Sequence, residues 1–325
     1  MRTGPQDTWE RVLPYAVRAP SSHNTQPWRF LVAADGRLHL YADRSRALPV
    51  VDPDGRELVM SCGAALTHLL VALRHLGHAG QVETLPDPRD PDLLAVVGLG
   101  EERPPSEEDQ RLFGVIEVRS THRGAFATER VSSQTLAGLR ADAEAYGVTL
   151  TVLDGDDDAA VAALVGEGDR TQFADAGFRR ELAAWIRSNH TRRLDGIRGD
   201  ALGLGDLASL LAATVVARVD TGAGQARKDE ELVLTAPALL LLSTPGDTTA
   251  DWLSAGQAVA QVLLRAAVHG MAASFLNQPV EVPDLRDRLR DLSGSGTCPQ
   301  LLLRVGYADP PARPSYRRPV DDVLG

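Results

Sequence analysis

The chain has 325 residues, of which 43% are hydrophobic, and its formal net charge is −10 at pH 7. This composition predicts a packed globular protein of two average domains or one large α/β unit. The acidic charge argues against non-specific binding to nucleic acid or to an anionic membrane. Two cysteines, Cys62 and Cys298, are too few for a disulfide framework or a zinc site. Because no apolar stretch is long enough to span a membrane and the first residues lack the core of a signal peptide, we expect a cytoplasmic protein.

A polar turn is the first distinctive segment, residues 19–30, with the sequence APSSHNTQPWRF. Its serine hydroxyls and the carboxamide of Asn24 could bind the edge of a heterocycle, because a carboxamide both donates and accepts hydrogen bonds. The same residues also fit the end of a helix, a serine-capped turn and the start of a strand. Taken alone, the segment favours this second interpretation, which needs no ligand.

An internal repeat follows in chain order. Residues 61–77 and 254–270 both open with Ser-x-Gly and close on glycine, and both predict a buried helix. The flanks repeat as well, since strands are expected on both sides of each helix. Their expected ranges are a hairpin over 28–43 and strands over 93–100, 232–244 and 301–309. The sequence therefore predicts an α+β fold of two related lobes, like a symmetric dimer fused into one chain.

The two lobes are expected to meet near the polar, proline-containing residues 101–110. We therefore predict an N-terminal lobe of residues 1–110 and a C-terminal lobe of residues 111–325. The second lobe has an additional stretch at about 165–230, in which an amphipathic helix precedes a glycine-rich loop. Such a stretch forms either a lid over a site or an extra segment that only packs against its own lobe, and the residues alone favour neither.

Basic residues gather in two places. Arg119, Thr121 and Arg123 alternate along RSTHRGAF, so an extended backbone would direct them to one side. Two guanidinium groups beside a hydroxyl suit a phosphate, although a solvated basic segment has the same composition. Arg317 and Arg318 form the second cluster, near the C-terminus.

Together these segments resemble the FMN-binding nitroreductase superfamily. APSSHNTQPWRF is similar to its Pro-Ser-x-x-Asn-x-Gln-Pro-Trp segment, RSTHRGAF to its Arg-x-Ser-x-Arg-x-x-Phe segment, and YRRPVDDVL to its C-terminal tail. The two motifs stand in the reverse of their usual order, and each lobe has only one of them. This arrangement is similar to the Acg subfamily, in which two nitroreductase lobes are fused in one chain.

The resemblance implies one FMN per chain, held between the lobes, and a degenerate second site. Arg119, Thr121 and Arg123 would bind the phosphate and the pyrimidine side, with Arg317 and Arg318 reaching the phosphate. The ring would be covered from the other lobe, and N5 would lie near the segment from Ser274 to Asn277. The residues implied on the first lobe are Pro20, Ser21, Ser22, Asn24 and Gln26.

The resemblance also implies an oxidoreductase that takes electrons from NADPH or NADH and passes them to a small-molecule acceptor. Two alternatives stay open: a stress-related protein that sequesters FMN with little turnover, and a dehydrogenase that tailors a specialised metabolite. No catalytic side chain and no metal site are predicted. The fused chain would act as a monomer that mimics a dimer, or would associate further.

Overall fold

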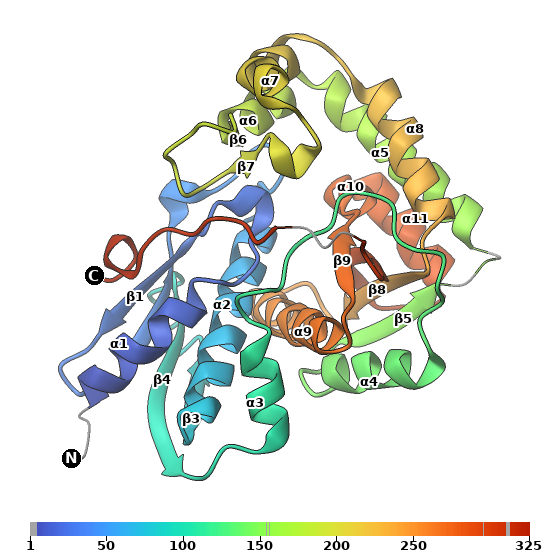
Figure 1. The fold of residues 1–325 in the computed structure, drawn as a ribbon. Helices are drawn as coiled ribbons and strands as arrows, with labels where there is room; N and C mark the ends of the chain where they lie inside the picture. Colours follow the sequence, from blue (N-terminus) through green and yellow to red (C-terminus); the bar gives the residue numbers. More distant parts are fainter. Residues whose placement is uncertain (1–4, 154, 156, 295, 310–312) are drawn as a thin grey trace.

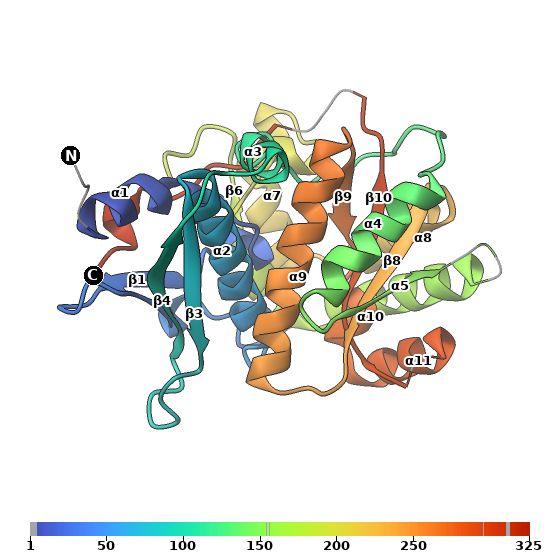
Figure 2. The same ribbon diagram turned by 90° about the horizontal axis from the view of Figure 1, so that it is seen from below.

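A computed structural model describes residues 5–153, 155, 157–294, 296–309 and 313–325. The fold is α+β, with two antiparallel four-stranded sheets on opposite sides of a pair of long helices (Figures 1 and 2). Figure 2 shows these helices, α2 (Arg56–His75) and α9 (Thr249–Val268), side by side at the centre of the molecule. The site described below lies beside this helix pair.

The first sheet contains the predicted hairpin and packs against α2 and the N-terminal helix α1 (Pro5–Ala16). Phe30 pairs with Leu40 across the hairpin, and both side chains are fully buried with Trp9 and Trp28. In spatial order, its strands are β1 (Trp28–Val32), β2 (Leu38–Ala42), β4 (Leu93–Glu102) and β3 (His78–Thr84).

The second sheet has β8 (Ala238–Thr244) and β10 (Cys298–Gly306) at its centre, between β5 (Thr149–Leu153) and β9 (Ala272–Phe275). Strand β8 begins later than the predicted strand over 232–244, because the preceding helix continues to Leu234. Pro237 separates the two elements, since proline disfavours helical backbone in the residue before it. The helices of this lobe are α4 (Ser133–Glu144), α5 (Asp158–Ala174), α8 (Gly222–Leu234), α10 (Gln278–Glu281) and α11 (Pro283–Ser293).

Both central helices begin about five residues before the predicted segments 61–77 and 254–270. The Asp52 carboxylate accepts the amide N–H groups of Glu57 and Leu58 at the start of α2. At the start of α9, Thr248 and Asp251 form a reciprocal capping box. Helix α2 is long and apolar enough to cross a membrane, but 83% of its apolar window is buried inside this fold. Its apolar composition is therefore that of a core helix of this fold.

The expected linker over 101–110 is shorter in the structure, because β4 runs to Glu102 and α3 (Glu107–Gly114) begins soon after. Helices α5 and α8 pack side by side and against the second sheet. Between them the chain leaves the lobe as residues 176–221, here called the lid (Figure 1). The lid contains α6 (Ala176–Trp185), β6 (Ile186–Arg187), β7 (Ile197–Arg198) and α7 (Asp206–Arg218).

The C-terminal tail returns from the second sheet to the first (Figure 1). There the Phe30 amide donates a 2.7 Å hydrogen bond to the carbonyl of Val323, and Leu324 bridges to Phe30 in parallel. This crossing carries Arg317 past the end of α1. The tail therefore places a residue of the second half beside the polar turn of the first.

Candidate functional site

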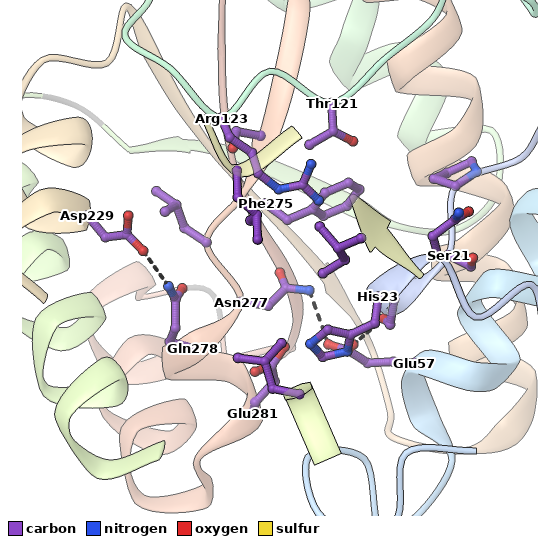
Figure 3. A pocket seen from close by; sticks show the side chains of 18 of the residues that line it. Ser21, His23, Glu57, Thr121, Arg123, Asp229, Phe275, Asn277, Gln278 and Glu281 are labelled. Carbon is purple, nitrogen blue, oxygen red and sulfur yellow. Dashed lines mark hydrogen bonds between the residues drawn. The ribbon is translucent and has the colours of Figure 1, made fainter. Parts of the chain in front are cut away.

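A cavity of about 570 Å³ lies between the polar turn, α2, the second sheet and the lid. This volume is in the range of ligand and cofactor sites. Figure 3 shows that its side chains come from both halves of the chain, with Ser21, His23 and Glu57 from the first and Thr121, Arg123 and Asn277 from the second. Ten of the twelve predicted site residues line it: Pro20, Ser21, Ser22, Asn24, Arg119, Thr121, Arg123, Ser274, Asn277 and Arg317.

The polar turn has an unusual backbone. His23, Asn24 and Gln26 have φ angles of 49°, 55° and 55°, in the left-handed region that non-glycine residues rarely adopt. The Ser21 hydroxyl accepts a 3.0 Å hydrogen bond from the amide of Gln26 and holds this conformation. Because each such residue costs about 1 kcal/mol or more, the conformation is typical of functional segments. The turn is therefore more than the simple serine-capped connection that its residues favoured.

Arg119 and Arg123 lie on a strap that runs along β9. Thr121 pairs with Ala273 as an isolated parallel bridge, which keeps the strap extended. Arg119 is 8% exposed, and its Nε is buried without a hydrogen-bond partner. Burial lowers the pKa of Arg119 to about 10 and also lowers the pKa of Arg123, and no carboxylate contributes to either shift. Both cations face the cavity without a counterion from the described part of the chain.

Arg317 is the third cation at this end of the cavity. It donates hydrogen bonds to the carbonyl oxygens of Ala19 and Arg18, which orient it toward the polar turn. Burial, together with the positive charges of Arg119 and Arg18, lowers its pKa to about 9. We call Arg119, Arg123 and Arg317 the arginine end of the cavity.

Two predicted residues, Gln26 and Arg318, do not line the cavity. The Gln26 side chain is fully buried, donates a 2.8 Å hydrogen bond to the Leu194 carbonyl and accepts one from the Arg318 amide. The Arg318 guanidinium donates to the carbonyl of Asp322, within the tail itself. Both residues thus join the turn, the lid and the tail.

Ser274 and Asn277 lie at the end of β9 and just after it. Ser274 is 5% exposed. The Asn277 side chain donates a 3.1 Å hydrogen bond to Glu57 and accepts a 3.2 Å bond from the amide of Leu302. Because both of its polar groups are engaged, the carboxamide has a fixed orientation at the cavity wall.

Several titratable residues at the cavity were not predicted. His23 lies between Glu57 and Arg123, and burial lowers its pKa to about 4, so the imidazole is neutral. Glu57 is 3% exposed and accepts hydrogen bonds from Ser22 and Asn277. Burial and the charge of Glu57 raise the pKa of Glu281 well above its ordinary value, which favours a proton on Glu281 beside Glu57.

A second group of unpredicted residues lies on α5 and α8. Asp169 and Asp229 accept hydrogen bonds of 3.2 and 2.9 Å from the same amide group, that of Gln278 (Figure 3 shows the second). Burial and the neighbouring Asp229 raise the pKa of Asp169 to about 7, and burial also raises the pKa of Asp229. Glu57 could have been noticed as a charge on an apolar helix, but no sequence pattern distinguishes these two aspartates from surface acids.

The lid closes one side of the cavity with apolar side chains, among them Phe178, Leu182 and Ile197. It is attached to the polar turn by hydrogen bonds from Asn24 to the Gly196 carbonyl and from Gln26 to the Leu194 carbonyl. Of the two alternatives for the extra stretch, the structure thus shows a cover over the cavity.

Relatives of this chain are named nitroreductases. A putative NAD(P)H nitroreductase of Mycobacterium tuberculosis is 35% identical over 98% of this chain and 91% of its own length. The putative NAD(P)H nitroreductase Acg of the same organism is 31% identical over 98% of this chain and 95% of its own.

No protein-family model matches the chain. Among solved structures, the FMN- and NADPH-dependent nitroreductase NfnB from a Sphingopyxis strain is 20% identical, with a TM-score of 0.45 over 66% of this chain and 97% of that one. The extent and identity of the match to the mycobacterial proteins place the chain in a family: it belongs to the NAD(P)H nitroreductases, in the group that includes Acg.

Proposed function

We propose that the protein is an FMN-dependent oxidoreductase that takes electrons from NADPH or NADH and reduces a small-molecule acceptor. The observation that carries the proposal is the arginine end of the cavity, where three guanidinium groups lack a carboxylate partner in the described residues. Unpaired buried charges are costly, so a bound anion is the expected counterion. The relatives named above support a nitroreductase with a nicotinamide donor.

The residues present fit FMN. Guanidinium forks match phosphate oxygens, and Thr121 adds a hydroxyl beside Arg119 and Arg123. On the opposite wall, Asn24 Oδ1 is buried without a hydrogen-bond partner. An acceptor there suits the N–H group at the edge of a flavin ring. The proposal places one FMN per chain in this cavity, between the predicted lobes 1–110 and 111–325.

FMN, when bound, supplies two-electron transfer to this site. The chain's own residues then have three tasks. Arg119, Arg123 and Arg317 hold the phosphate, and the fixed carboxamide of Asn277 orients the ring. The lid excludes water, and the Glu57–Glu281 pair keeps a proton at the cavity wall.

A second function is favoured by one observation, the closure of the lid. Because the lid is hydrogen-bonded to the polar turn and lines the cavity with apolar side chains, a nicotinamide reaches the cavity only if the lid opens. A protein that stores or sequesters FMN would have this design. A dehydrogenase that tailors a specialised metabolite is the third interpretation, and no observation on this site favours it.

Flavin occupancy after purification tests the proposal, with Arg123→Gln as the site variant. Arg37→Gln is the matched control, since Arg37 is exposed and pairs with Asp35. We expect about one FMN per chain in the wild type and the control, and a loss of at least tenfold in FMN affinity in Arg123→Gln. Undiminished affinity in that variant would contradict the assignment of the arginine end.

Anaerobic mixing with NADPH or NADH then separates reductase from store. Rapid loss of the oxidised flavin absorbance identifies a reductase. Loss of absorbance with dithionite but not with either nicotinamide identifies a store or a different electron donor. A ratio near two FMN per chain would contradict the single site.

A further inference from the structure

The end of the cavity away from the arginines is acidic. Asp169 and Asp229 are 2% and 7% exposed, and Glu281 of α10, which accepts a hydrogen bond from Gln172 of α5, lines the same cavity. Figure 3 shows Asp229 and Glu281 in a different part of the cavity from Arg123 and Thr121. We call Asp169, Asp229 and Glu281 the acid end.

The carboxyl groups of the acid end have amide partners but no ion pair within 4 Å in the described residues. The charges of Lys228 and Arg304 act on Asp229 from a greater distance, and those of Arg170 and Glu230 act on Asp169. Gln278 bridges Asp169 and Asp229, Gln225 donates a 3.0 Å hydrogen bond to Asp229, and Gln172 donates a 2.6 Å bond to Glu281. Asp169 Oδ2 is buried and has no hydrogen-bond partner. The acid end therefore has an acceptor atom left over at the wall of a cavity.

Two other buried carboxylates in this protein form ion pairs with arginines, whereas the buried Asp52 accepts only the backbone amides at the start of α2. Asp195 forms ion pairs with Arg46, Arg187 and Arg193, and Asp109 lies within 3.1 Å of Arg103. At Asp195 and Asp109 the chain thus supplies arginines as counterions for buried acids. The cavity has cations without a carboxylate partner at one end and carboxyl groups without an ion pair in the described residues at the other. The reasoning that assigns a phosphate to the first end favours a cation at the second when the aspartates are ionised.

We propose that the acid end binds the ammonium group of a cationic substrate, so that the enzyme prefers acceptors that carry a protonated amine. The inference rests on the proposed function, in which the arginine end is occupied by FMN. Helices α5 and α8 hold the two aspartates beside the lid, so the amine would lie beneath the cover, where water is excluded and an ion pair is strong.

The state of the acids makes this recognition dependent on pH. With a pKa of about 7, Asp169 is largely protonated at pH 6 and ionised at pH 8. A bound ammonium favours the ionised form and lowers that pKa, so binding releases a proton below about pH 7. Preference for a cation should accordingly be greatest at alkaline pH and fade as the pH falls.

Calorimetric titration of the oxidised holoprotein tests the inference with two matched probes, 4-nitrobenzylamine and 4-nitrobenzyl alcohol. At pH 8 we expect the amine to bind at least tenfold more tightly than the alcohol, with a smaller ratio at pH 6. The double variant Asp169→Asn, Asp229→Asn should bring the ratio close to one, and Asp229→Asn alone should lower it. Glu167→Gln is the control, since Glu167 is on the same helix but exposed and paired with Arg288.

Three results would overturn the inference. These are equal affinities for the two probes in the wild type, an amine preference that the aspartate variants leave unchanged, and a loss of FMN occupancy in those variants, which would assign the acid end to the flavin itself. Flavin content and reaction with NADPH test the proposed function separately. If the purified protein holds no FMN, the same titrations on the apoprotein still decide whether the acid end prefers the amine.

Discussion

Arg46 donates a 2.6 Å charge-assisted hydrogen bond to Asp195 and so joins the first half of the chain to the lid. Asp195 is 7% exposed and also accepts from Arg187 and Arg193, both close to it in the lid. Arg46 further lies over the ring of Trp185, at 5.4 Å from its centroid. One carboxylate thus organises the lid and fastens it over the cavity.

Replacing this carboxylate should open the lid. In Asp195→Asn three guanidinium groups lose their counterion, which we expect to cost about 3 kcal/mol, as for other broken buried pairs. FMN should dissociate at least tenfold faster, and protease should cut the lid sooner, while the rest of the chain stays folded. Asp220→Asn, at the exposed end of the lid, is the control. An unchanged dissociation rate would show that the lid does not hold the flavin.

The contact between Arg46 and Asp195 also predicts how FMN release depends on pH. The hydrogen bonds from Arg193, Arg46 and Arg187 outweigh burial and lower the pKa of Asp195 to about 2. A carboxylate with a lowered pKa stabilises the fold above its unfolded value of about 4 and loses that contribution as the pH falls toward 2. The rate of FMN release should therefore not change with pH above about pH 4 on account of this pair, and it should rise as the pH falls from 4 toward 2. In Asp195→Asn this rise should be absent.

Arg304 positions the strap without touching the cavity. It is 1% exposed, donates hydrogen bonds to the carbonyls of His122 and Gly124 on either side of Arg123, and lies 4.6 Å from the Phe126 ring centroid. Arg304→Met keeps the volume and removes the two hydrogen bonds. We expect FMN affinity to fall about tenfold, because Arg123 is no longer held in place.

A matched measurement distinguishes positioning from general loss of stability. Leu303→Val, on the neighbouring residue of the same strand, should destabilise the fold by about 1 kcal/mol with little change in FMN affinity. If Arg304→Met lowers the melting temperature but binds FMN as well as the wild type, Arg304 is only structural.

The sequence predicts the parts of the site that have a local pattern. The polar turn and the strap are continuous segments, so Asn24, Thr121 and Arg123 could be placed from spacing and resemblance, and all three line the cavity. Asp169 and Asp229 could not, because they are sixty residues apart and become neighbours only when α5 packs on α8. Gln26 belongs to the same motif, but its side chain is hydrogen-bonded to the Leu194 carbonyl of the lid and does not line the cavity, which spacing alone does not indicate.

The close approach of the two repeat helices, α2 and α9, gives a prediction about packing in the core. Their glycines face each other: a Cβ on Gly256 would lie 2.0 Å from the carbonyl oxygen of Met60, and one on Gly63 would lie 2.3 Å from that of Leu253. Gly256→Ala must separate the two helices, which should cost about 3 kcal/mol or prevent folding. Denaturant unfolding measures the change.

Gly224→Ala is the control for that substitution. Gly224 is exposed on α8, and an added Cβ there would contact nothing within 4 Å. We expect this variant to be more stable than the wild type by about 0.5 kcal/mol, since alanine loses less backbone entropy than glycine. If Gly256→Ala unfolds at the same denaturant concentration as the wild type, α2 and α9 do not approach each other as closely as described at Gly256.

The neutral His23 should make the flavin-free protein sensitive to acid. Its pKa is lowered to about 4 in the folded state against about 6.5 in an unfolded chain, so between these values the unfolded chain binds more protons. The free energy of unfolding therefore falls as the pH decreases, by up to about 1.4 kcal/mol per pH unit for one histidine. His23→Asn keeps a residue that tolerates the positive φ and removes the titration. Denaturant unfolding of both proteins between pH 7 and 4.5 should show a shallower slope for the variant, and identical slopes would mean that folding does not lower the pKa of His23.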